Sequence, residues 1–505
     1  MSATPSVGPL SQVERQPIDL DQQTVYPVTN PYYELHLTAI DCTLLHAVKA
    51  AGLPKMNLGF GAYENWQLPR VAAEYLTRCD GQTSHADIAT SLNLPFRLLA
   101  DQVAEEISTQ TGAITLRSEP SSERQTIFTT GDFDSFAPLH MSIEITDTCN
   151  FRCDHCYVSA SPEKLGRSDY QTLIELFATM WEHGVKIVEL TGGECTTHPH
   201  FREILAAAAA RFHLVAIITN GYLLGRRDGL ADYVASFDNV SVQISLDGNR
   251  EFHDRFRKKE GSFDALCAGA RKLTQQGVIL RIAMSVTPDN VDQVEDVFNV
   301  AKAIGARAFS VAAITSFGRG ADLGMCAETD HALQHEIARQ LAPHADDPLF
   351  DANRFSLESV AQTKQINCGA GWKTFALNGA TGEVRSCLFL ADSKKFGSVD
   401  RDAYGDIFRS EYMTMFRNAS SPSAELDTCR DCAYLGTCRG CFAKAFRVSE
   451  TDYPECPWRH KYFPGMSLKA EPGSAPGASG CGCGSGNGQR GRPIASGERH
   501  LVGEV

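Results

Sequence analysis

The feature that most constrains this fold is a repeated alternation of short apolar runs with helix-period segments. Six such runs occur between residues 139 and 345, each followed by apolar residues spaced three and four positions apart. Alternating strand and helix units form a parallel sheet, and eight would close a full barrel. We therefore expect an α/β fold, a partial (β/α)6 barrel of the TIM type. The predicted strands are Met141–Thr146, Lys186–Leu190, Leu214–Thr219, Val240–Leu246, Val278–Val286 and Ala308–Ala313.

Residues suited to chemistry lie where these predicted strands end. Cys149 follows the first strand, Gly192 and Gly193 follow the second, Asn220 follows the third and Asp247 follows the fourth. In parallel α/β folds the carboxyl ends of the strands meet at one edge, and that edge holds the ligand. The functional site is therefore expected at this edge.

The sharpest local signal is the segment CNFRCDHC, directly after the first predicted strand. It spaces Cys149, Cys153 and Cys156 by three and then two intervening residues. Three thiolates on one short loop can hold three corners of a 4Fe-4S cluster and leave the fourth iron open. The alternative is a structural zinc site, which would need a fourth ligand. His155 is the nearest candidate for that ligand.

This loop resembles the cluster loop of the radical S-adenosylmethionine (radical SAM) enzymes, which is Cys-x3-Cys-x2-Cys with an apolar or aromatic residue before the last cysteine. His155 occupies that place, which is a departure from the pattern. The resemblance covers about residues 139 to 345. It implies that S-adenosylmethionine (SAM) binds the open iron, and that one electron then cleaves SAM to a 5′-deoxyadenosyl radical, which abstracts hydrogen from the substrate.

The same resemblance implies a set of SAM contacts. Gly192, Gly193 and Glu194 stand in a Thr-Gly-Gly-Glu segment that is similar to the one holding the methionine amino group. Ser245, in VQISLDG, resembles the contact to the ribose or carboxylate, and Arg257, in HDRFR, resembles the partner of the SAM carboxylate. A guanidinium binds a carboxylate well through two parallel hydrogen bonds. No catalytic acid or base is predicted.

Cysteines become dense after the barrel segment. The seven in this region are Cys368, Cys387, Cys429, Cys432, Cys438, Cys441 and Cys456. Their order resembles the SPASM domain, an auxiliary-cluster extension of radical SAM enzymes that modify peptides and proteins, although two residues separate Cys438 from Cys441 where three are usual. The resemblance implies one complete 4Fe-4S cluster on Cys429, Cys432, Cys438 and Cys456, and a second on Cys368, Cys387 and Cys441 without a fourth thiolate. A pair of zinc knuckles is the alternative.

The N-terminal segment predicts a small α+β module over residues 21–118. Helical spacing at 71–79 and 85–92 flanks a turn, and a third amphipathic segment leads to the extended run Ala113–Leu116. The segment resembles the PqqD-like element, a winged-helix relative that binds the leader of a ribosomally made precursor peptide. A DNA-binding winged helix is the alternative, but HADIATSLNLPF contains no Lys or Arg.

Charge and composition limit the location and the partners. The net charge of −14 disfavours nucleic acid and anionic membranes as partners. The chain has neither an apolar run of about 18 residues nor a signal-peptide core, so we expect a cytoplasmic protein, in which 17 cysteines indicate metal or redox chemistry rather than disulfides. The expected parts are a flexible terminus (1–20), the module (21–118), a linker (119–138), the barrel (139–345), the SPASM region (346–464) and a Gly/Ser/Pro-rich tail (465–505).

Together these features predict a radical SAM maturase that modifies a ribosomal precursor peptide, by a cross-link such as a thioether or carbon–carbon bond, or by epimerisation. The leader of that peptide and an electron donor such as flavodoxin or ferredoxin are the expected partners. An anaerobic sulfatase maturase is one alternative, although Leu388 stands where those enzymes carry an aspartate base after the cysteine. A winged-helix DNA-binding regulator with a metal-sensing domain is another. Cys195 and Cys326 lie outside the motifs, and each is a candidate to donate a hydrogen atom or to fill the open cluster position, while Cys195 is alternatively a small apolar residue without a chemical role.

Overall fold

The computed structural model describes most of the chain between residues 24 and 466. The described ranges are 24–31, 33–38, 42–46, 65–93, 95–134, 138–314, 316–325, 327–347, 349, 368–371, 374–390 and 396–466. The predicted flexible terminus, Cys326 and nearly all of the predicted tail lie outside them. Within these ranges, no helix has the length and apolar character needed to cross a membrane.

Six parallel strands form the centre of the fold, and each lies where the sequence predicts one. They pair in chain order, which confirms the partial barrel. Their bounds are β7 (His140–Glu144), β8 (Ile187–Thr191), β9 (Leu214–Thr219), β10 (Val240–Ser245), β11 (Ile279–Val286) and β12 (Ala308–Ala313).

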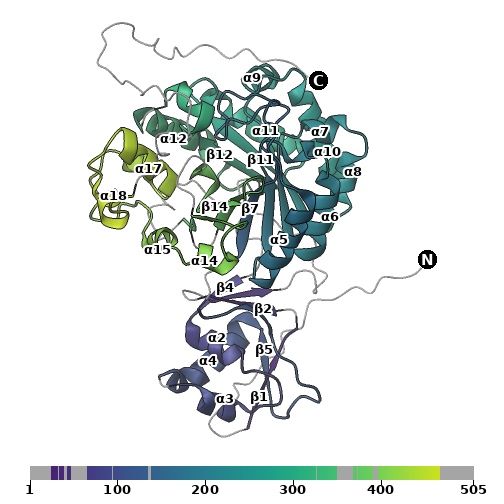
Figure 1. The fold of residues 1–505 in the computed structure, drawn as a ribbon, viewed down its shortest axis with the longest axis vertical. Helices are drawn as coiled ribbons and strands as arrows, with labels where there is room; N and C mark the ends of the chain where they lie inside the picture. The colour runs from purple at the N-terminus through teal and green to yellow at the C-terminus, as the bar shows by residue number, and fades with distance from the viewer. Residues whose placement is uncertain are drawn as a thin grey trace, which may run out of the picture. The chain divides into compact units, whose positions relative to one another are not determined.

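Helices cover the outer side of these strands (Figure 1). Buried apolar residues on α10, among them Leu266, Ala270 and Leu273, recur at helical spacing and face the sheet. The side chain of Asp169 accepts a hydrogen bond from the N–H of Thr172 (2.9 Å) and so begins α5. The helices are α5 (Tyr170–Glu182), α6 (Phe201–Arg211), α7 (Tyr222–Arg226), α8 (Leu230–Ala235), α9 (Arg250–Phe256), α10 (Ser262–Gln275), α11 (Val294–Ile304) and α12 (Ala327–Leu341).

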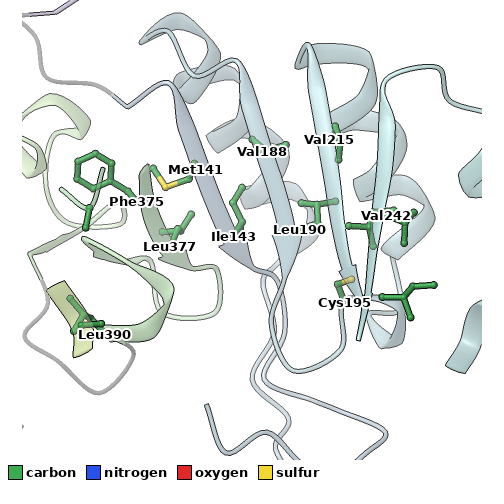
Figure 2. Packing of buried hydrophobic residues seen from close by; sticks show 14 of the residues in the cluster. Met141, Ile143, Val188, Leu190, Cys195, Val215, Val242, Phe375, Leu377 and Leu390 are labelled. Atoms are coloured by element: carbon green, nitrogen blue, oxygen red, sulfur yellow. The ribbon is translucent and has the colours of Figure 1, made fainter. Parts of the chain in front are cut away.

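Burial alternates along the strands because one face meets the helices and the other faces the interior of the barrel. In β9, Val215 and Ile217 are fully buried, whereas Leu214, Ala216 and Ile218 are less buried. Figure 2 shows buried side chains of this kind across neighbouring strands, including Ile143 of β7, Leu190 of β8 and Val215 of β9. The apolar core therefore lies between sheet and helices, and the interior face is left to more polar residues.

The cysteine-rich region joins the same sheet. Strand β13 (Thr374–Asn378) pairs in parallel with β7, and β14 (Glu383–Arg385) and β15 (Gly397–Ser398) follow in antiparallel order, which makes nine strands. A buried ion pair between Arg385 of β14 and Glu144 of β7 reaches across β13. The barrel sheet thus extends into the region predicted as a separate domain from residue 346 onward.

An aromatic cluster holds the helices of this region together. Phe416, Phe442, Phe446, Trp458 and Phe463 pack ring against ring, with centroids 4.7–5.9 Å apart, and all are buried. Such rings supply a large apolar area to a small core. The helices are α14 (Tyr404–Ile407), α15 (Glu411–Asn418), α16 (Leu435–Cys438), α17 (Phe442–Thr451) and α18 (Pro457–Tyr462).

The described part of the N-terminal module contains a four-stranded sheet, a two-stranded sheet and three α-helices. The larger sheet has the order β4-β3-β2-β6, and β1 pairs with β5. Strand β6 lies within residues 119–138, which the sequence predicts to be a linker. These residues form a strand because they hydrogen-bond in parallel to β2. The elements are β1 (Tyr26–Thr29), β2 (Tyr33–Leu37), β3 (Cys42–His46), β4 (Asn65–Leu68), α2 (Arg70–Leu76), α3 (His85–Ser91), α4 (Ala100–Glu106), β5 (Ile114–Arg117) and β6 (Phe128–Gly131).

A buried charged cluster connects β2 to the barrel. Glu34 lies 3.2 Å from Nζ of Lys186 and 2.7 Å from Nε2 of His213. Burial by itself would raise the pKa of Glu34, but the hydrogen bond and charge of His213, with the charge of Lys186, hold it below the usual value. Lys186 and His213 directly precede β8 and β9, so the module contacts the barrel at the amino ends of its strands.

Candidate functional site

The three cysteines that follow β7 belong to a small apolar cluster in the loop. Cys149 and Cys153 pack with Phe151 and Ala160, and Cys156 borders the same cluster. The N–H of Phe151 donates to Sγ of Cys149 (3.4 Å), and the N–H of Ala160 donates to Sγ of Cys156 (3.3 Å). Hydrogen bonds to cysteine sulfur are a regular feature of iron–sulfur sites.

Burial makes the thiols of Cys149 and Cys153 weak acids in the absence of metal, because it raises the pKa of both. Burial, with the charge of Glu194 adding to it, raises the pKa of Cys149 to about 12. Burial raises the pKa of Cys153 to about 11, although Arg257 opposes the shift. Metal binding must therefore displace protons from both sulfurs, as is usual for thiolate sites. The donor set fits a cluster held by three cysteines.

Gly192 and Gly193 let two loops approach each other. A Cβ on Gly192, whose φ is +135°, would lie 2.3 Å from the carbonyl oxygen of Thr146, and one on Gly193 would lie 2.3 Å from that of Thr148. The N–H of Gly193 donates to Thr146 (2.6 Å) and that of Glu194 donates to Thr148 (2.9 Å). These glycines therefore set the position of the backbone that leads into Cys149.

We expect Gly193→Ala to destabilise the protein by about 1–3 kcal/mol, because the added methyl group meets backbone that cannot rotate away. It should also weaken SAM binding. Gly405→Ala is the control, since its nearest atom would be a flexible arginine nitrogen 3.9 Å away. Urea unfolding and equilibrium dialysis with labelled SAM measure the two effects. Equal behaviour of the two variants would contradict the role given to Gly193.

The carboxylate of Glu194 is fully buried and is satisfied by the protein itself. Oε1 accepts from the hydroxyls of Thr196 (2.5 Å) and Thr219 (2.6 Å), and Oε2 accepts from the N–H of Asn220 (2.7 Å). Burial nevertheless leaves the pKa of Glu194 above its ordinary value. In this structure Glu194 ties the end of β8 to the end of β9, and its predicted contact with SAM stays a prediction.

Asp247 is the centre of a buried polar network beside the cysteine loop. Its Oδ2 accepts from Nε of Arg257 (2.8 Å) and lies 3.5 Å from Nε2 of His155, and its Oδ1 accepts from the N–H of Ser285 (3.0 Å). Burial alone would raise the pKa of Asp247, but the positive charge of Arg257, with a smaller contribution from the N–H of Ser285, keeps it below the usual value. No hydrogen bond to a described residue engages the two terminal nitrogens of Arg257.

His155 turns toward this network. Its ring stacks on Phe256 at a centroid distance of 4.3 Å and an interplanar angle of 10°. Burial lowers the pKa of His155 to about 4, so the ring is neutral at pH 7. Its Nδ1, like Nδ2 of Asn150, is buried and makes no hydrogen bond to any described residue. Such atoms beside the cysteine loop suit a site that binds a polar ligand.

Ser245 lies at the end of β10 and is half-buried. Gln243 and Ser245 occupy the less buried positions of this strand, two residues apart, and so share the interior face of the barrel. Ala216, Ile218 and Ala283 occupy the same kind of position on the flanking strands. The interior is thus lined here by small, polar and apolar groups, and Ser245 faces it close in sequence to Asp247.

Arg319 is a site residue that sequence reasoning missed. It lies in the loop after β12, yet its Nε donates to the carbonyl of Cys153 (2.8 Å) and one terminal nitrogen donates to that of Ala160 (2.9 Å). Its own N–H donates to the carbonyl of Cys156 (3.0 Å). The last strand of the partial barrel therefore supplies a clamp for the loop after the first strand, a contact for which the sequence carries no local signal.

The seven later cysteines gather in two sets. Burial raises the pKa of Cys387 to about 12, with Cys441 and Cys368 adding to the shift. Burial likewise raises the pKa of Cys438, and the other contributors are led by Cys456. The other thiols near Cys438 are Cys429, Cys432 and Cys456, and Cys441 of the first set also contributes, so the two sets adjoin each other. These are the two sets that the resemblance assigns to two clusters, and their role as ligands stays a prediction.

The described side chains do not form a site for a single metal ion. Across the described ranges, no three Cys, His, Asp or Glu side chains converge closely enough to hold one metal ion. A 4Fe-4S cluster differs because each cysteine binds its own iron. Cys195 is fully buried in the barrel core, where its Sγ donates to the carbonyl of Ile218 (3.4 Å), so it serves as a small core residue.

Comparisons with known proteins show which family has this arrangement of residues. Residues 143–301 match the Radical SAM superfamily, and residues 368–433 match SPASM, an iron-sulfur cluster-binding domain. The antilisterial bacteriocin subtilosin biosynthesis protein AlbA of Bacillus subtilis (strain 168) is 33% identical over 329 residues, which cover 65% of this chain and 72% of AlbA. The chain belongs to the radical SAM superfamily. Its radical SAM domain binds a 4Fe-4S cluster and SAM, and its SPASM domain binds auxiliary iron–sulfur clusters.

Two further similarities agree with this radical SAM assignment. The sporulation killing factor maturation protein SkfB of Bacillus subtilis (strain 168) is 30% identical over 315 residues, which cover 61% of this chain and 73% of SkfB. The crystal structure of Streptococcus suis SuiB bound to precursor peptide SuiA superposes with a TM-score of 0.57 at 13% identity, over 85% of this chain and 98% of SuiB. The SuiB comparison shows the shared radical SAM fold.

Proposed function

We propose that this radical SAM enzyme modifies a ribosomally synthesised precursor peptide. Two relatives at 33% and 30% identity are named for bacteriocin biosynthesis and for maturation of a killing factor. The proposal is carried by one observation: a three-thiol loop at the carboxyl ends of the barrel strands is joined in one sheet to a region that holds two further sets of thiols. The modification is a cross-link or an epimerisation.

The proposed ligands follow from this arrangement. Cys149, Cys153 and Cys156 hold the catalytic cluster, and Arg319 holds the loop that carries them. When bound, the cluster and SAM supply a 5′-deoxyadenosyl radical for hydrogen abstraction. The terminal nitrogens of Arg257 offer two parallel donors for the SAM carboxylate.

The remaining SAM contacts and the auxiliary clusters complete the proposed site. Ser245 faces the SAM ribose or carboxylate from the interior of the barrel. Gly192, Gly193 and Glu194 place the backbone beside the methionine amino group. The auxiliary clusters number two, one for each set of thiols. The set with three cysteines leaves an iron open for the substrate or for an electron.

The N-terminal module is proposed to bind the leader of the precursor. Its four-stranded sheet ends at β4, which pairs with β3 alone among the described strands. An extended peptide can add a strand to such an edge. The exposed residues of α3 include Ala86, Asp87 and Thr90 and no cation, which does not suit DNA phosphates. The module contacts the barrel at the strand ends opposite the cysteine loop, so the bound precursor would have to reach around the barrel.

We further propose that the enzyme works in the cytoplasm, receives electrons from a flavodoxin or ferredoxin, and binds neither nucleic acid nor membrane. Its many free thiols need a reducing compartment, and its net charge of −14 opposes anionic polymers and surfaces. The sulfatase-maturase alternative is not favoured, because Leu388, the residue after Cys387, offers no base.

Two measurements test the proposal. Anaerobically reconstituted protein, reduced with dithionite, should release methionine and 5′-deoxyadenosine from SAM. Mass spectrometry of a precursor peptide co-expressed with the protein should then show the loss of two hydrogens for a cross-link, or unchanged mass with deuterium uptake from solvent for epimerisation. Release of neither SAM product, with about one zinc per chain, would favour a metal-sensing regulator.

A further inference from the structure

We propose that the surface around Tyr222 is the docking site for an acidic one-electron carrier protein that reduces the catalytic cluster. The inference rests on the proposed function, because a radical SAM centre consumes one electron for each SAM that it cleaves. In this step the carrier loses one electron and the cluster gains it, so no bond is made or broken. An aromatic contact to the cysteine loop and nearby cations support this docking site.

The aromatic contact leads from the cysteine loop toward the surface. Phe151 lies between Cys149 and Cys153, and its N–H donates to Sγ of Cys149 (3.4 Å). Its ring meets the ring of Tyr222 edge to face, with centroids 5.7 Å apart. Tyr222 is only half-buried and begins α7. Tyr222 is therefore a partly exposed residue that is separated from the proposed cluster ligand Cys149 by one aromatic side chain.

Cations flank that point. Nζ of Lys259 lies 5.1 Å from the centroid of the Tyr222 ring, and Cζ of Arg226 lies 5.8 Å from it. Neither cation has an ion-pair partner among the described residues. Lys258, also exposed, pairs with Asp154 inside the cysteine loop. Residues 250–260 contain five basic and three acidic residues, but Arg257 is buried against Asp247, so four basic and three acidic residues leave this stretch with a surface excess of one positive charge.

This charge pattern selects an acidic partner. An acidic carrier would be repelled by the protein as a whole, but salt screens charges beyond about 8 Å at physiological ionic strength. Within that distance of Tyr222, the carrier meets Arg226 and Lys259, while the charge of Lys258 is offset by Asp154. Complementary charges of this kind orient the encounter and speed it more than they strengthen the complex. The expected partner is a small acidic flavoprotein or iron–sulfur protein, and flavodoxin is the probe chosen here.

The test compares two ways of supplying the electron. The double variant Arg226→Glu and Lys259→Glu should raise the KM for reduced flavodoxin by at least about tenfold in SAM cleavage. Cleavage driven by dithionite, a small reductant that needs no docking surface, should be unchanged. Lys272→Glu is the matched control, because it reverses an exposed charge near the other end of α10, about 15 Å along the helix from Ser262. It should leave both reactions unchanged.

Salt provides an independent measurement on the unmodified enzyme. Flavodoxin-driven cleavage should slow as ionic strength rises, and dithionite-driven cleavage should not. An unchanged KM for flavodoxin in the double variant would overturn the proposal. A rate of flavodoxin-driven cleavage that does not change with ionic strength would overturn it as well. If the double variant also loses the dithionite reaction, the milder pair Arg226→Gln and Lys259→Gln decides, and loss of both reactions there overturns it too. Failure of the unmodified enzyme with dithionite would instead refute the proposed function.

Discussion

Cys153→Ala is expected to abolish SAM cleavage and to remove about four irons per chain, while capture of the precursor leader by the N-terminal module persists. Substituting residues around a metal ligand already costs 10–100-fold, so losing a ligand should cost at least about 100-fold. The structure places Cys153 in the centre of the loop, held by Arg319 and buried beside Arg257. Iron analysis, product chromatography and fluorescence anisotropy with a labelled leader measure the three effects.

Cys267→Ala is the control for this experiment. Cys267 is buried on α10, in the core of the barrel and outside the cysteine motifs. It should keep its full iron content and its SAM cleavage. Full iron content in Cys153→Ala would contradict the ligand assignment. Loss of leader capture together with cleavage would show that the module does not act separately from the barrel.

Asp247→Ala is expected to destabilise the protein by about 3–5 kcal/mol, because it leaves the buried guanidinium of Arg257 without its counter-charge. It also removes the acceptor for the N–H of Ser285. The measurement is urea unfolding of the cluster-free protein under reducing conditions, followed by circular dichroism. Without Asp247, Arg257 should also lose its orientation, so SAM affinity should fall.

Asp264→Ala provides the matched comparison. Asp264 also pairs with an arginine, Arg250, but both side chains are more than half exposed, so its loss should cost no more than about 1 kcal/mol. The pKa of Asp247 lies below its usual value, so its contribution is complete above the unfolded pKa of about 3.9 and is lost as the pH falls below it. Similar losses of unfolding free energy in both variants would show that the Asp247–Arg257 pair contributes no more to stability than an exposed ion pair.

Local patterns were sufficient to predict the barrel. The strands β9 and β12 begin and end at the predicted residues, because their apolar runs are bounded by clear turns. The two-residue period of a strand puts Gln243 and Ser245 on one face of β10, and the structure puts both on the interior face. In these cases a short stretch of sequence is enough to predict where a strand begins and ends and which of its residues share a face.

Features that depend on distant partners could not be predicted in this way. Strand β13 joins the barrel through pairing with β7, and β6 joins the N-terminal sheet through pairing with β2, although each is only a few residues long. Arg319 contacts the cysteine loop from more than 150 residues away. The sequence relates Gly192 and Gly193 to the methionine amino group, and only the structure shows that they also approach the backbone of Thr146 and Thr148.

The most direct measurement is electron–nuclear double resonance on the reduced protein with SAM carrying ¹⁵N in its amino group. Three cysteines on one loop leave one iron for SAM, so a ¹⁵N coupling to the catalytic cluster should appear and should be missing in Cys153→Ala. A ¹⁴N coupling from histidine in place of ¹⁵N, lost in His155→Ala, would show that His155 fills that position and would contradict the account.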